Sequence, residues 1–268
     1  MDYLEDKKLL ELRFSNGMMI LPFVRYKLLC SKNQDNTSSS SRNPVSKPTI
    51  FFRLFSNLIR IRVKKKKLVF FSSTLFNVEV EGEKGIYYNS MDGYYYDLFP
   101  EDSLLIEDAD EEFKWRAKNS YKSMSFIRTY LLFLSFTLSR VFNKIKPIRR
   151  IDFDYIIKNY PELYTIEELG RLDYFHRIYY SLIKWVLKKT QCNLIAVNCG
   201  SYGETYAPLI KAAHDLGIKV IEMQHGAILQ SHLGYHADDF IVNHDEYATY
   251  LPDILYSFGD YWKQYIDW

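Results

Sequence analysis

Short apolar runs separated by polar turns recur along the second half of the chain, and longer amphipathic stretches lie between them. Residues 194–198 and 218–223 are apolar segments of strand length, and residues 204–216 carry apolar side chains at helical spacing. Gly217 follows that stretch directly, as a glycine that ends a helix does. Strand, helix and strand joined by short turns predict a right-handed parallel βαβ unit.

Further elements are predicted on both sides of this unit. Residues 68–71 and 104–106 are apolar runs bounded by charged or turn residues, which is typical of buried strands. Two aromatic segments, 85–89 and 93–97, predict a hairpin. Helices are predicted over residues 111–145 and 173–189 and from Gly259 onward. Two further short strands are predicted, over residues 240–242 and 254–258. The predicted fold is an α/β, Rossmann-like, open and mostly parallel sheet flanked by helices.

The N-terminal part is organised differently. Residues 1–30 predict a small ordered element with a turn at Asn16-Gly17. Residues 31–48 are polar, with four consecutive serines and two prolines, and cannot bury apolar area. The predicted organisation is an N-terminal element with a flexible linker over residues 1–48, followed by the α/β domain over residues 49–268.

The most apolar long stretch, residues 126–138, leaves two interpretations open. It is shorter than the ~20 residues of a membrane span, and Arg128 interrupts it. A helix buried in the fold is the favoured interpretation. An interfacial helix is the alternative, because five basic residues follow closely and could meet anionic lipid headgroups. They are Arg140, Lys144, Lys146, Arg149 and Arg150.

Composition and charge exclude several classes of protein. With 47% hydrophobic residues among 268, the chain is neither disordered nor collagen-like. Its 35 Lys and Arg against 33 Asp and Glu argue against a dedicated nucleic-acid binder, which usually carries a large basic excess. The three cysteines are too few and too widely spaced for a disulfide framework or a zinc site, and the charged N-terminus is unlike a signal peptide. A reducing, cytoplasmic location is expected.

The turn at residues 198–203 is the first candidate binding segment. In open parallel sheets, ligands bind beyond the carboxyl ends of the strands, and this turn follows a predicted strand. Small residues allow the backbone to approach a ligand, and free N–H groups at a helix start favour anions or sugar oxygens. The spacing matches neither a dinucleotide-binding nor a P-loop motif, and an ordinary βα turn is the alternative. The candidate residues are Gly200, Ser201 and Tyr202.

His225 is the candidate for chemistry. It follows the predicted strand at 218–223 closely and precedes Gly226, so its imidazole should emerge at the carboxyl edge of the sheet. An imidazole with an ordinary pKa of about 6.5 accepts a hydroxyl proton at neutral pH. A histidine held in a loop for structural reasons is the alternative. Glu222 cannot be assumed to orient it, since neighbouring strand residues face opposite sides.

No metal site is predicted, although four histidines lie within twenty residues. The spacing of His225, His232, His236 and His244 contains no H-E-x-x-H helix motif, and the segment is rich in loops. Cys199 as a nucleophile is weaker still, because no motif supports it.

A family resemblance adds to these observations. Residues 217–226 (G-I-K-V-I-E-M-Q-H-G), His232-Leu-Gly-Tyr235, Leu251-Pro-Asp253 and Phe258-Gly-Asp-Tyr-Trp262 resemble bacterial capsular and surface-polysaccharide biosynthesis proteins. These are similar to glycosyltransferases of the two-Rossmann-domain (GT-B) type, and a comparable His-Gly turn occurs in glycerophosphotransferases that build teichoic acid. The segment Leu21–Tyr26 is similar to an N-terminal W-P-x-x-R motif of the same proteins, with Phe and Val in place of the expected residues. The resemblance covers about residues 190–268.

The resemblance implies a function and assigns roles. His225 would be the base for an acceptor hydroxyl, and Gln224 and Gly226 would shape the turn. Glu222 would either be structural or support a residue that contacts the substrate. The predicted substrate-binding residues are Gln224, Gly226, Gly200, Ser201, Tyr202, His232 and Tyr235. The implied reaction transfers a sugar from a nucleotide-sugar to a glycan or lipid-linked glycan, without a cofactor, with contact to the inner membrane surface as an added expectation.

One departure from the GT-B pattern qualifies this expectation. The sequence stops at Trp268, where a nucleotide-binding second domain of ~100–200 residues should follow, so this chain alone is expected to be inactive. No donor-binding residue is predicted. Two alternatives stay open: a non-catalytic carbohydrate- or nucleotide-binding module, and a glycerophosphotransferase.

Overall fold

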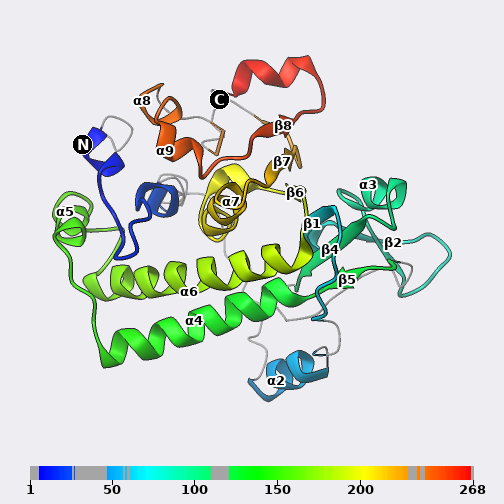
Figure 1. The fold of residues 1–268 in the computed structure, drawn as a ribbon, viewed down its shortest axis with the longest axis horizontal. Coiled ribbons are helices and arrows are strands. Elements are labelled where there is room, and N and C mark those ends of the chain that lie inside the picture. The colour runs from blue at the N-terminus through cyan, green and yellow to red at the C-terminus, as the bar shows by residue number, and fades with distance from the viewer. Residues whose placement is uncertain are drawn as a thin grey trace.

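The described part of the chain folds around a six-stranded sheet in which every neighbouring pair of strands runs parallel (Figure 1). This computed structural model describes residues 6–25, 27, 47–56, 58, 61–109, 121–228, 234–235 and 239–266. The strand order is β5-β4-β1-β6-β7-β8. The strands are β1 (Leu68–Ser73), β4 (Ser103–Asp108), β5 (Met124–Ser125), β6 (Leu194–Val197), β7 (Lys219–Met223) and β8 (Ile254–Tyr256). The predicted Rossmann-like α/β fold is confirmed.

Burial on both faces explains why the central strands were recognisable. In β1, Val69 and Phe71 pack into the core on one face, while Phe70 is buried on the other. In β4, Leu104, Leu105 and Ile106 are completely buried. Strands covered on both faces read as continuous apolar runs rather than as alternating patterns. The predicted strands at 68–71 and 104–106 are therefore confirmed, and both extend by a few residues.

Three helices pack against one face of the sheet. They are α4 (Ile127–Ile145), α6 (Ile166–Thr190) and α7 (Ala207–His214), with α5 (Ile151–Asn159) between the first two in sequence. Figure 1 shows α6 between α7 and α4, and α4 as the outermost of the three. A capping box between Thr165 and Glu168 starts α6, and Gln191 ends it in the left-handed conformation with a φ of 55°.

A smaller set of elements lies on the opposite face. The chain leaves β1 through the 3₁₀ turn η4 (Thr74–Phe76), forms a hairpin of β2 (Asn77–Glu79) and β3 (Tyr87–Asn89), and enters α3 (Gly93–Leu98). Tyr96 of α3 packs with Tyr121 and Phe70 against this face.

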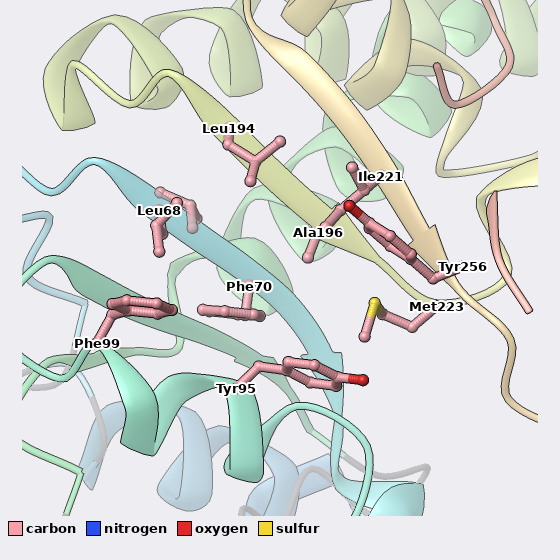
Figure 2. A pocket seen from close by; sticks show the side chains of 10 residues that line it. Leu68, Phe70, Tyr95, Phe99, Leu194, Ala196, Ile221, Met223 and Tyr256 are labelled. Carbon is pink, nitrogen blue, oxygen red and sulfur yellow. The ribbon is translucent and has the colours of Figure 1, made fainter. Parts of the chain in front are cut away.

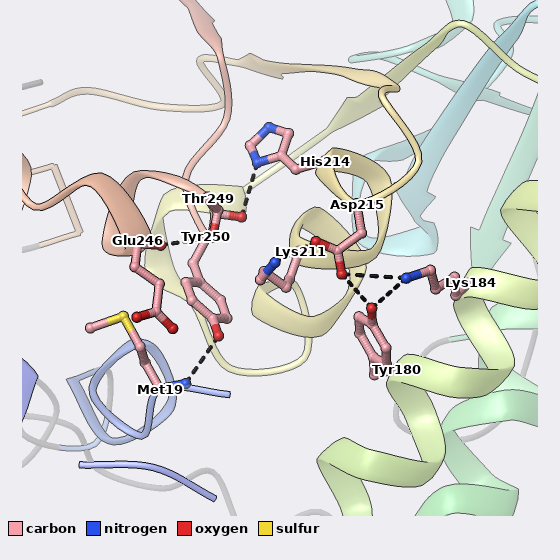
Figure 3. Close-up of polar contacts among 9 residues, drawn as sticks. All are labelled: Met19, Tyr180, Lys184, Lys211, His214, Asp215, Glu246, Thr249 and Tyr250. Carbon is pink, nitrogen blue, oxygen red and sulfur yellow. Dashed lines mark hydrogen bonds and ion pairs between the residues drawn. The ribbon is translucent and has the colours of Figure 1, made fainter. Parts of the chain in front are cut away.

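The N-terminal segment packs into the C-terminal part of the fold. The 3₁₀ turn η1 (Lys7–Leu10), an isolated bridge between Arg13 and Met19, and a helical turn at residues 21–25 share one apolar cluster with α5, α6, α8 (Asp239–Val242) and α9 (Asp245–Ala248). The Met19 amide donates to the Tyr250 hydroxyl over 3.0 Å, and His214 contacts the Thr249 carbonyl oxygen at 2.9 Å (Figure 3). These contacts join segments that lie far apart in the sequence.

Polar contacts also link α6 to α7. The Lys184 ammonium donates to the Tyr180 hydroxyl over 2.6 Å, and both residues contact the Asp215 carboxylate that follows α7 (Figure 3). The remaining described helical elements are α2 (Lys47–Ser56), η5 (Gly200–Tyr202) and η6 (Asp260–Tyr265).

Several predicted elements were wrong in type or extent. Residues 240–242 belong to the helical turn α8 rather than to a strand, and Gly93–Asp97 lies in helix α3 rather than in a hairpin. The hairpin partner of residues 87–89 is instead 77–79. Both errors have one physical cause, since a run of three to five apolar or aromatic residues is too short to distinguish a helical from an extended period.

Helix boundaries also differ from the predictions. The helix predicted over 111–145 begins at Ile127 within the described residues, because Met124–Ser125 pairs with β4 as strand β5. The helix predicted from residue 204 begins at Ala207, since Gly203 and Glu204 both have positive φ angles.

Burial of α4 is only partial. Phe133, Leu134 and Phe136 are each more than 40% exposed, so the favoured interpretation of this stretch as a buried helix holds for one side of α4 only. Within the described residues, no helix combines the length and the apolar composition that crossing a membrane requires.

Candidate functional site

The strand order places a topological switch point between β1 and β6. The chain leaves β1 toward β4 on one side of it, whereas β6, β7 and β8 lie on the other side. The connections after β1 and after β6 therefore separate at their carboxyl ends. In open α/β sheets, ligands bind at this topological switch point. The turn after β6 and the turn after β7 both reach this edge of the sheet.

The turn after β6 has an unusual backbone. Cys199 adopts the left-handed conformation with a φ of 61°, which is uncommon for a residue with a side chain. Gly200 follows it, and a Cβ atom at Gly200 would lie 2.7 Å from a methyl group of Val197. The turn thus requires glycine at 200 and holds strain at 199, and strain of this kind clusters at functional sites.

The imidazole of His225 lies beside this turn. Its Nε2 and Nδ1 atoms are 3.4 and 3.7 Å from the Cys199 sulfur, and Nε2 is 3.5 Å from the Tyr202 hydroxyl. The ring of Phe76, from the turn after β1, has its centroid 6.3 Å from that of the imidazole. His225 is partly exposed. Turns from three strands therefore meet at His225, and its ring is neither enclosed by apolar groups nor at the opposite edge of the sheet.

Glu222 holds the turn after β6 in place. Its described contacts do not include the imidazole of His225. This buried carboxylate accepts hydrogen bonds from the Ser201 amide over 2.8 Å, from the Ser201 hydroxyl, and from the Tyr235 hydroxyl over 2.7 Å. Burial raises the pKa of Glu222, and the bonds from Ser201 and Tyr235 oppose that rise. The side chains of Ser201 and Tyr235, predicted to contact substrate, are thus buried and joined to Glu222.

Gln224 and Gly226 form the turn after β7. The Gln224 side-chain amide donates to the Gly226 carbonyl oxygen over 2.7 Å and accepts from the Phe258 amide over 2.7 Å. The Gln224 backbone amide also donates to the Tyr256 carbonyl oxygen over 2.9 Å. Gln224 itself is buried, so it links this turn to the segment after β8 and sets the direction in which His225 leaves the sheet.

Tyr202 completes the partly exposed surface around His225. Its ring centroid lies 5.8 Å from the imidazole and 5.9 Å from the ring of Tyr235. A Cβ atom at Gly234 would approach the Tyr202 ring to 3.1 Å. Tyr202 and His225 are the two predicted site residues whose side chains share one partly exposed edge. His232 lies outside the described residues.

A second polar cluster, at β1 and β6, was not predicted as part of the site. The Asn198 amide donates to the buried Asp92 carboxylate over 2.9 Å, and the Asn89 amide donates to the Ser72 hydroxyl over 2.8 Å. Burial raises the pKa of Asp92 to about 6, against the opposing effect of hydrogen bonds from Ser72 and Asn198. The sequence does contain turn residues after the apolar segments, which could have marked Asp92 and Asn198 as candidates. Their pairing depends on the tertiary fold, so the sequence alone does not show it.

Arg128 carries a buried positive charge near the same edge. It pairs with Asp108 at the end of β4, donates to the Tyr179 hydroxyl over 3.0 Å and to the Thr205 hydroxyl over 3.1 Å, and lies 4.3 Å from the ring centre of Tyr206. Burial by itself would lower the pKa of Arg128, but the interactions with Tyr179 and Tyr206 keep that pKa above its usual value. Arg128 therefore fixes α4 to the loop between η5 and α7.

The metal-ligating groups that the structure describes do not form a cluster. Among the described residues, no three or more His, Cys, Asp or Glu side chains converge in a way that could hold a metal ion.

An apolar pocket lies on the sheet face that carries α3. Its volume is about 390 Å³, and its lining is almost entirely aliphatic and aromatic (Figure 2). The lining residues are Leu68, Val69, Phe70, Tyr95, Phe99, Leu194, Ala196, Ile221, Met223 and Tyr256. Met223 is the last residue of β7, two residues before His225, so the pocket extends along the sheet to the site edge. Its size is within the range of small-molecule sites.

Comparison of the chain with protein-family models, with curated protein sequences and with solved structures gives no match in any of the three. The function proposed below is therefore supported by the site geometry and by the sequence resemblance alone.

Proposed function

We propose that this protein is a glycosyltransferase-like protein of surface-polysaccharide biosynthesis in which His225 is the general base. The observation that carries the proposal is the partly exposed imidazole at the switch point of a Rossmann-like sheet, within 3.4 to 3.7 Å of a thiol and a phenol. Ligands of such sheets bind at this edge. The sequence resemblance around residues 217–226 points to the same residue.

The proposed chemistry uses the imidazole as a proton acceptor. A ring nitrogen of His225 takes the proton of an acceptor hydroxyl while that oxygen bonds to the anomeric carbon and the nucleotide phosphate leaves with the bond electrons. The described contacts of the imidazole with Cys199 and Tyr202 are weak or long, because thiols are weak donors and 3.5 Å exceeds an ordinary O–H···N distance. An incoming hydroxyl can therefore replace either contact.

Glu222 and Gln224 support this role by fixing the backbone around His225. Glu222 holds the η5 turn through Ser201, and Gln224 holds the turn after β7. Neither side chain needs to touch a substrate. The role proposed for these residues is to keep the imidazole at one position at the edge of the sheet.

Replacement of His225 tests the proposal. In the full-length enzyme, His225→Ala and His225→Gln should lower sugar transfer by about 100-fold or more, the usual effect of losing a general base. The measurement is release of nucleotide from a panel of nucleotide-sugars in the presence of glycan acceptors, with CDP-glycerol included to detect glycerophosphate transfer instead. His214→Gln is the matched control, because His214 lies at the end of α7 and contacts Thr249. Near-normal transfer by His225→Ala would remove the proposed role.

The apolar pocket favours a second candidate, a non-catalytic binding module. Tyr95, Phe99 and Tyr256 offer aromatic faces on which a nucleobase or a sugar ring could stack. Under this alternative, calorimetric titration of the full-length protein detects binding of a nucleotide-sugar, while the same protein releases no nucleotide with any acceptor. Binding accompanied by release would favour the transferase.

A further inference from the structure

The second half of helix α4 exposes apolar side chains to solvent and buries polar ones, whereas the first half buries Ile127 and Leu131 in the core. Its buried side includes Ser135, Ser139 and Asn143, which recur every four residues along one face. Its exposed side includes Leu134, Val141 and Ile145, with exposed fractions of 43%, 46% and 75%. A helix on the surface of a water-soluble domain usually shows the opposite arrangement.

Packing against α6 fixes this orientation. The Asn143 amide donates to the Glu167 carbonyl oxygen over 3.1 Å, and a Cβ atom at Gly170 would collide with the Asn143 side chain. Phe136 stacks on Phe175 of α6 with ring centroids 4.2 Å apart. Because Asn143 and Phe136 make these contacts from α4, the helix cannot rotate its exposed apolar side inward without losing them.

Helix α2 continues the exposed apolar surface. The Tyr130 hydroxyl of α4 donates to the Leu54 carbonyl oxygen, which places α2 against the first half of α4. Phe52 and Phe55 of α2 are 71% and 65% exposed. Figure 1 shows both helices at the same outer side of the molecule, beyond α6. We call this surface, formed by the exposed apolar residues of α2 and α4, the outer face.

All the charged residues of α4 are basic, and most of them lie at one end of the outer face. No Asp or Glu occurs between residues 127 and 151. The exposed apolar residues Leu134, Val141 and Ile145 form an apolar stripe on α4. The basic residues beside its second half and just beyond it are Arg140, Lys144, Lys146 and Arg149. A pocket of about 610 Å³ lies at this end of α4. Its lining contains four basic side chains and one acidic side chain: Arg140, Lys144, Arg149 and Arg171, with Glu167, beside Asn143, Pro147, Ile148 and Ile166.

We propose that the outer face docks on a membrane surface that contains anionic phospholipids. The apolar side chains of α2 and α4 enter the boundary between headgroups and acyl chains, and the basic pocket receives a headgroup phosphate. Charge selects this occupant over a second copy of the chain. In an antiparallel two-fold contact, the basic end of one outer face would meet the α2 end of the other, where helix α2 carries Arg53 and no Asp or Glu. Neither end of the outer face therefore offers a negative charge to a second copy, whereas an anionic surface complements the basic end.

Vesicle sedimentation tests the proposal on the unmodified protein. The protein should sediment with vesicles of phosphatidylcholine and about one third phosphatidylglycerol, remain in solution with phosphatidylcholine alone, and dissociate as salt is raised. The triple variant Arg140→Gln, Lys144→Gln and Arg149→Gln should bind about 100-fold more weakly, as expected from losing three basic residues near an anionic surface. Equal binding to both kinds of vesicle would overturn the proposal.

A second pair of variants distinguishes vesicle binding through the apolar stripe from nonspecific hydrophobic adsorption. Leu134→Ser, Val141→Ser and Ile145→Ser together should abolish vesicle binding. The matched control replaces Leu75, Val78 and Ile254 by serine, because these side chains are exposed to a similar extent but lie on η4, β2 and β8. The control should bind like the unmodified protein, and unchanged thermal melting should show that each variant is folded.

Sedimentation velocity distinguishes the other occupant. Concentration-dependent dimers that disappear in the stripe variant, together with vesicle binding that the variant retains, would overturn lipid docking in favour of a second copy. The proposal does not depend on His225, so its failure and the failure of the proposed transferase role are separate results.

Discussion

At the scale of single residues, the candidate site depends on a strained cysteine beside a histidine. Cys199 has a positive φ, and the glycine after it fits where a side chain would meet Val197. This conformation places the thiol 3.4 Å from Nε2 of His225. Burial and the nearby Glu222 carboxylate raise the pKa of the Cys199 thiol to about 12, so the thiol is neutral at physiological pH.

The neutral thiol leads to a prediction about chemical labelling. Because alkylation requires the thiolate, Cys199 in the folded protein should react with iodoacetamide at pH 8 at least ~100-fold more slowly than a thiol with an ordinary pKa. Mass spectrometry of the peptide containing Cys199 gives the rate, and the same peptide labelled in urea is the reference. Equal rates in the folded and unfolded protein would show that folding does not raise the pKa of Cys199.

At the scale of secondary-structure elements, His176 joins helix α6 to the N-terminal segment. Its imidazole is buried between aromatic rings, with the Phe23 ring centroid 3.7 Å and the Phe14 ring centroid 5.3 Å away. Among the described residues, neither ring nitrogen has a hydrogen-bond partner. Burial lowers the pKa of His176 well below its usual value, so the folded protein holds this ring neutral.

The sign of the resulting pH dependence follows from linkage. The unfolded chain binds a proton at His176 below about pH 6.5, whereas the folded protein does not, so acid favours unfolding. His176 should therefore lower the free energy of unfolding by up to about 1.4 kcal/mol per pH unit below pH 6.5. Urea unfolding of the unmodified protein and of His176→Phe at pH 7.5, 6 and 5 measures this.

Comparing the unmodified protein with His176→Phe separates the pH dependence caused by His176 from that caused by other titratable groups. Asp92 acts in the opposite direction, because its raised pKa of about 6 means that its contribution to stability is lost as pH rises through that value. The stability difference between His176→Phe and the unmodified protein should grow as pH falls. A difference independent of pH would contradict the neutral buried imidazole, and His176→Leu repeats the test with a different side-chain shape.

At the scale of the whole molecule, the N-terminal segment closes over the turn that carries the site. Gly203 has a φ of 83°, and a Cβ atom there would collide with the Pro22 carbonyl oxygen. Residues of the N-terminal segment also share one apolar cluster with α5, α8 and α9. The turn after β6 is therefore supported by a segment nearly two hundred residues away in the sequence.

Substitution of glycines with alanine measures this support. Gly203→Ala should lower the free energy of unfolding by about 3 kcal/mol or more, because backbone strain adds to the displacement of Pro22. Gly82→Ala is the matched control, with a φ of 79° and no atom within 4 Å of the added Cβ, and should cost only about 1 kcal/mol. Equal losses in urea unfolding would show that the contact with Pro22 contributes nothing.

The sequence by itself determined the parallel sheet and the location of His225 at its edge. Strands buried on both faces must be apolar throughout, so β1, β4, β6 and β7 were recognisable from composition and from the turns that follow them. A residue placed directly after such a strand must emerge at the carboxyl edge. Local pattern therefore sufficed wherever one segment and its burial decided the outcome.

The tertiary structure alone decided which distant residues meet and which faces are covered. Asp92 pairs with Asn198, and Glu222 binds Tyr235, only because the strand order brings their turns together. Residues 240–242 form a helical turn because packing, rather than a period of three residues, determines their conformation. The second half of helix α4 turns apolar residues outward because Asn143 packs against α6 and donates to the Glu167 carbonyl oxygen. Such contacts depend on three-dimensional neighbours, which hydrophobic spacing within one segment does not encode.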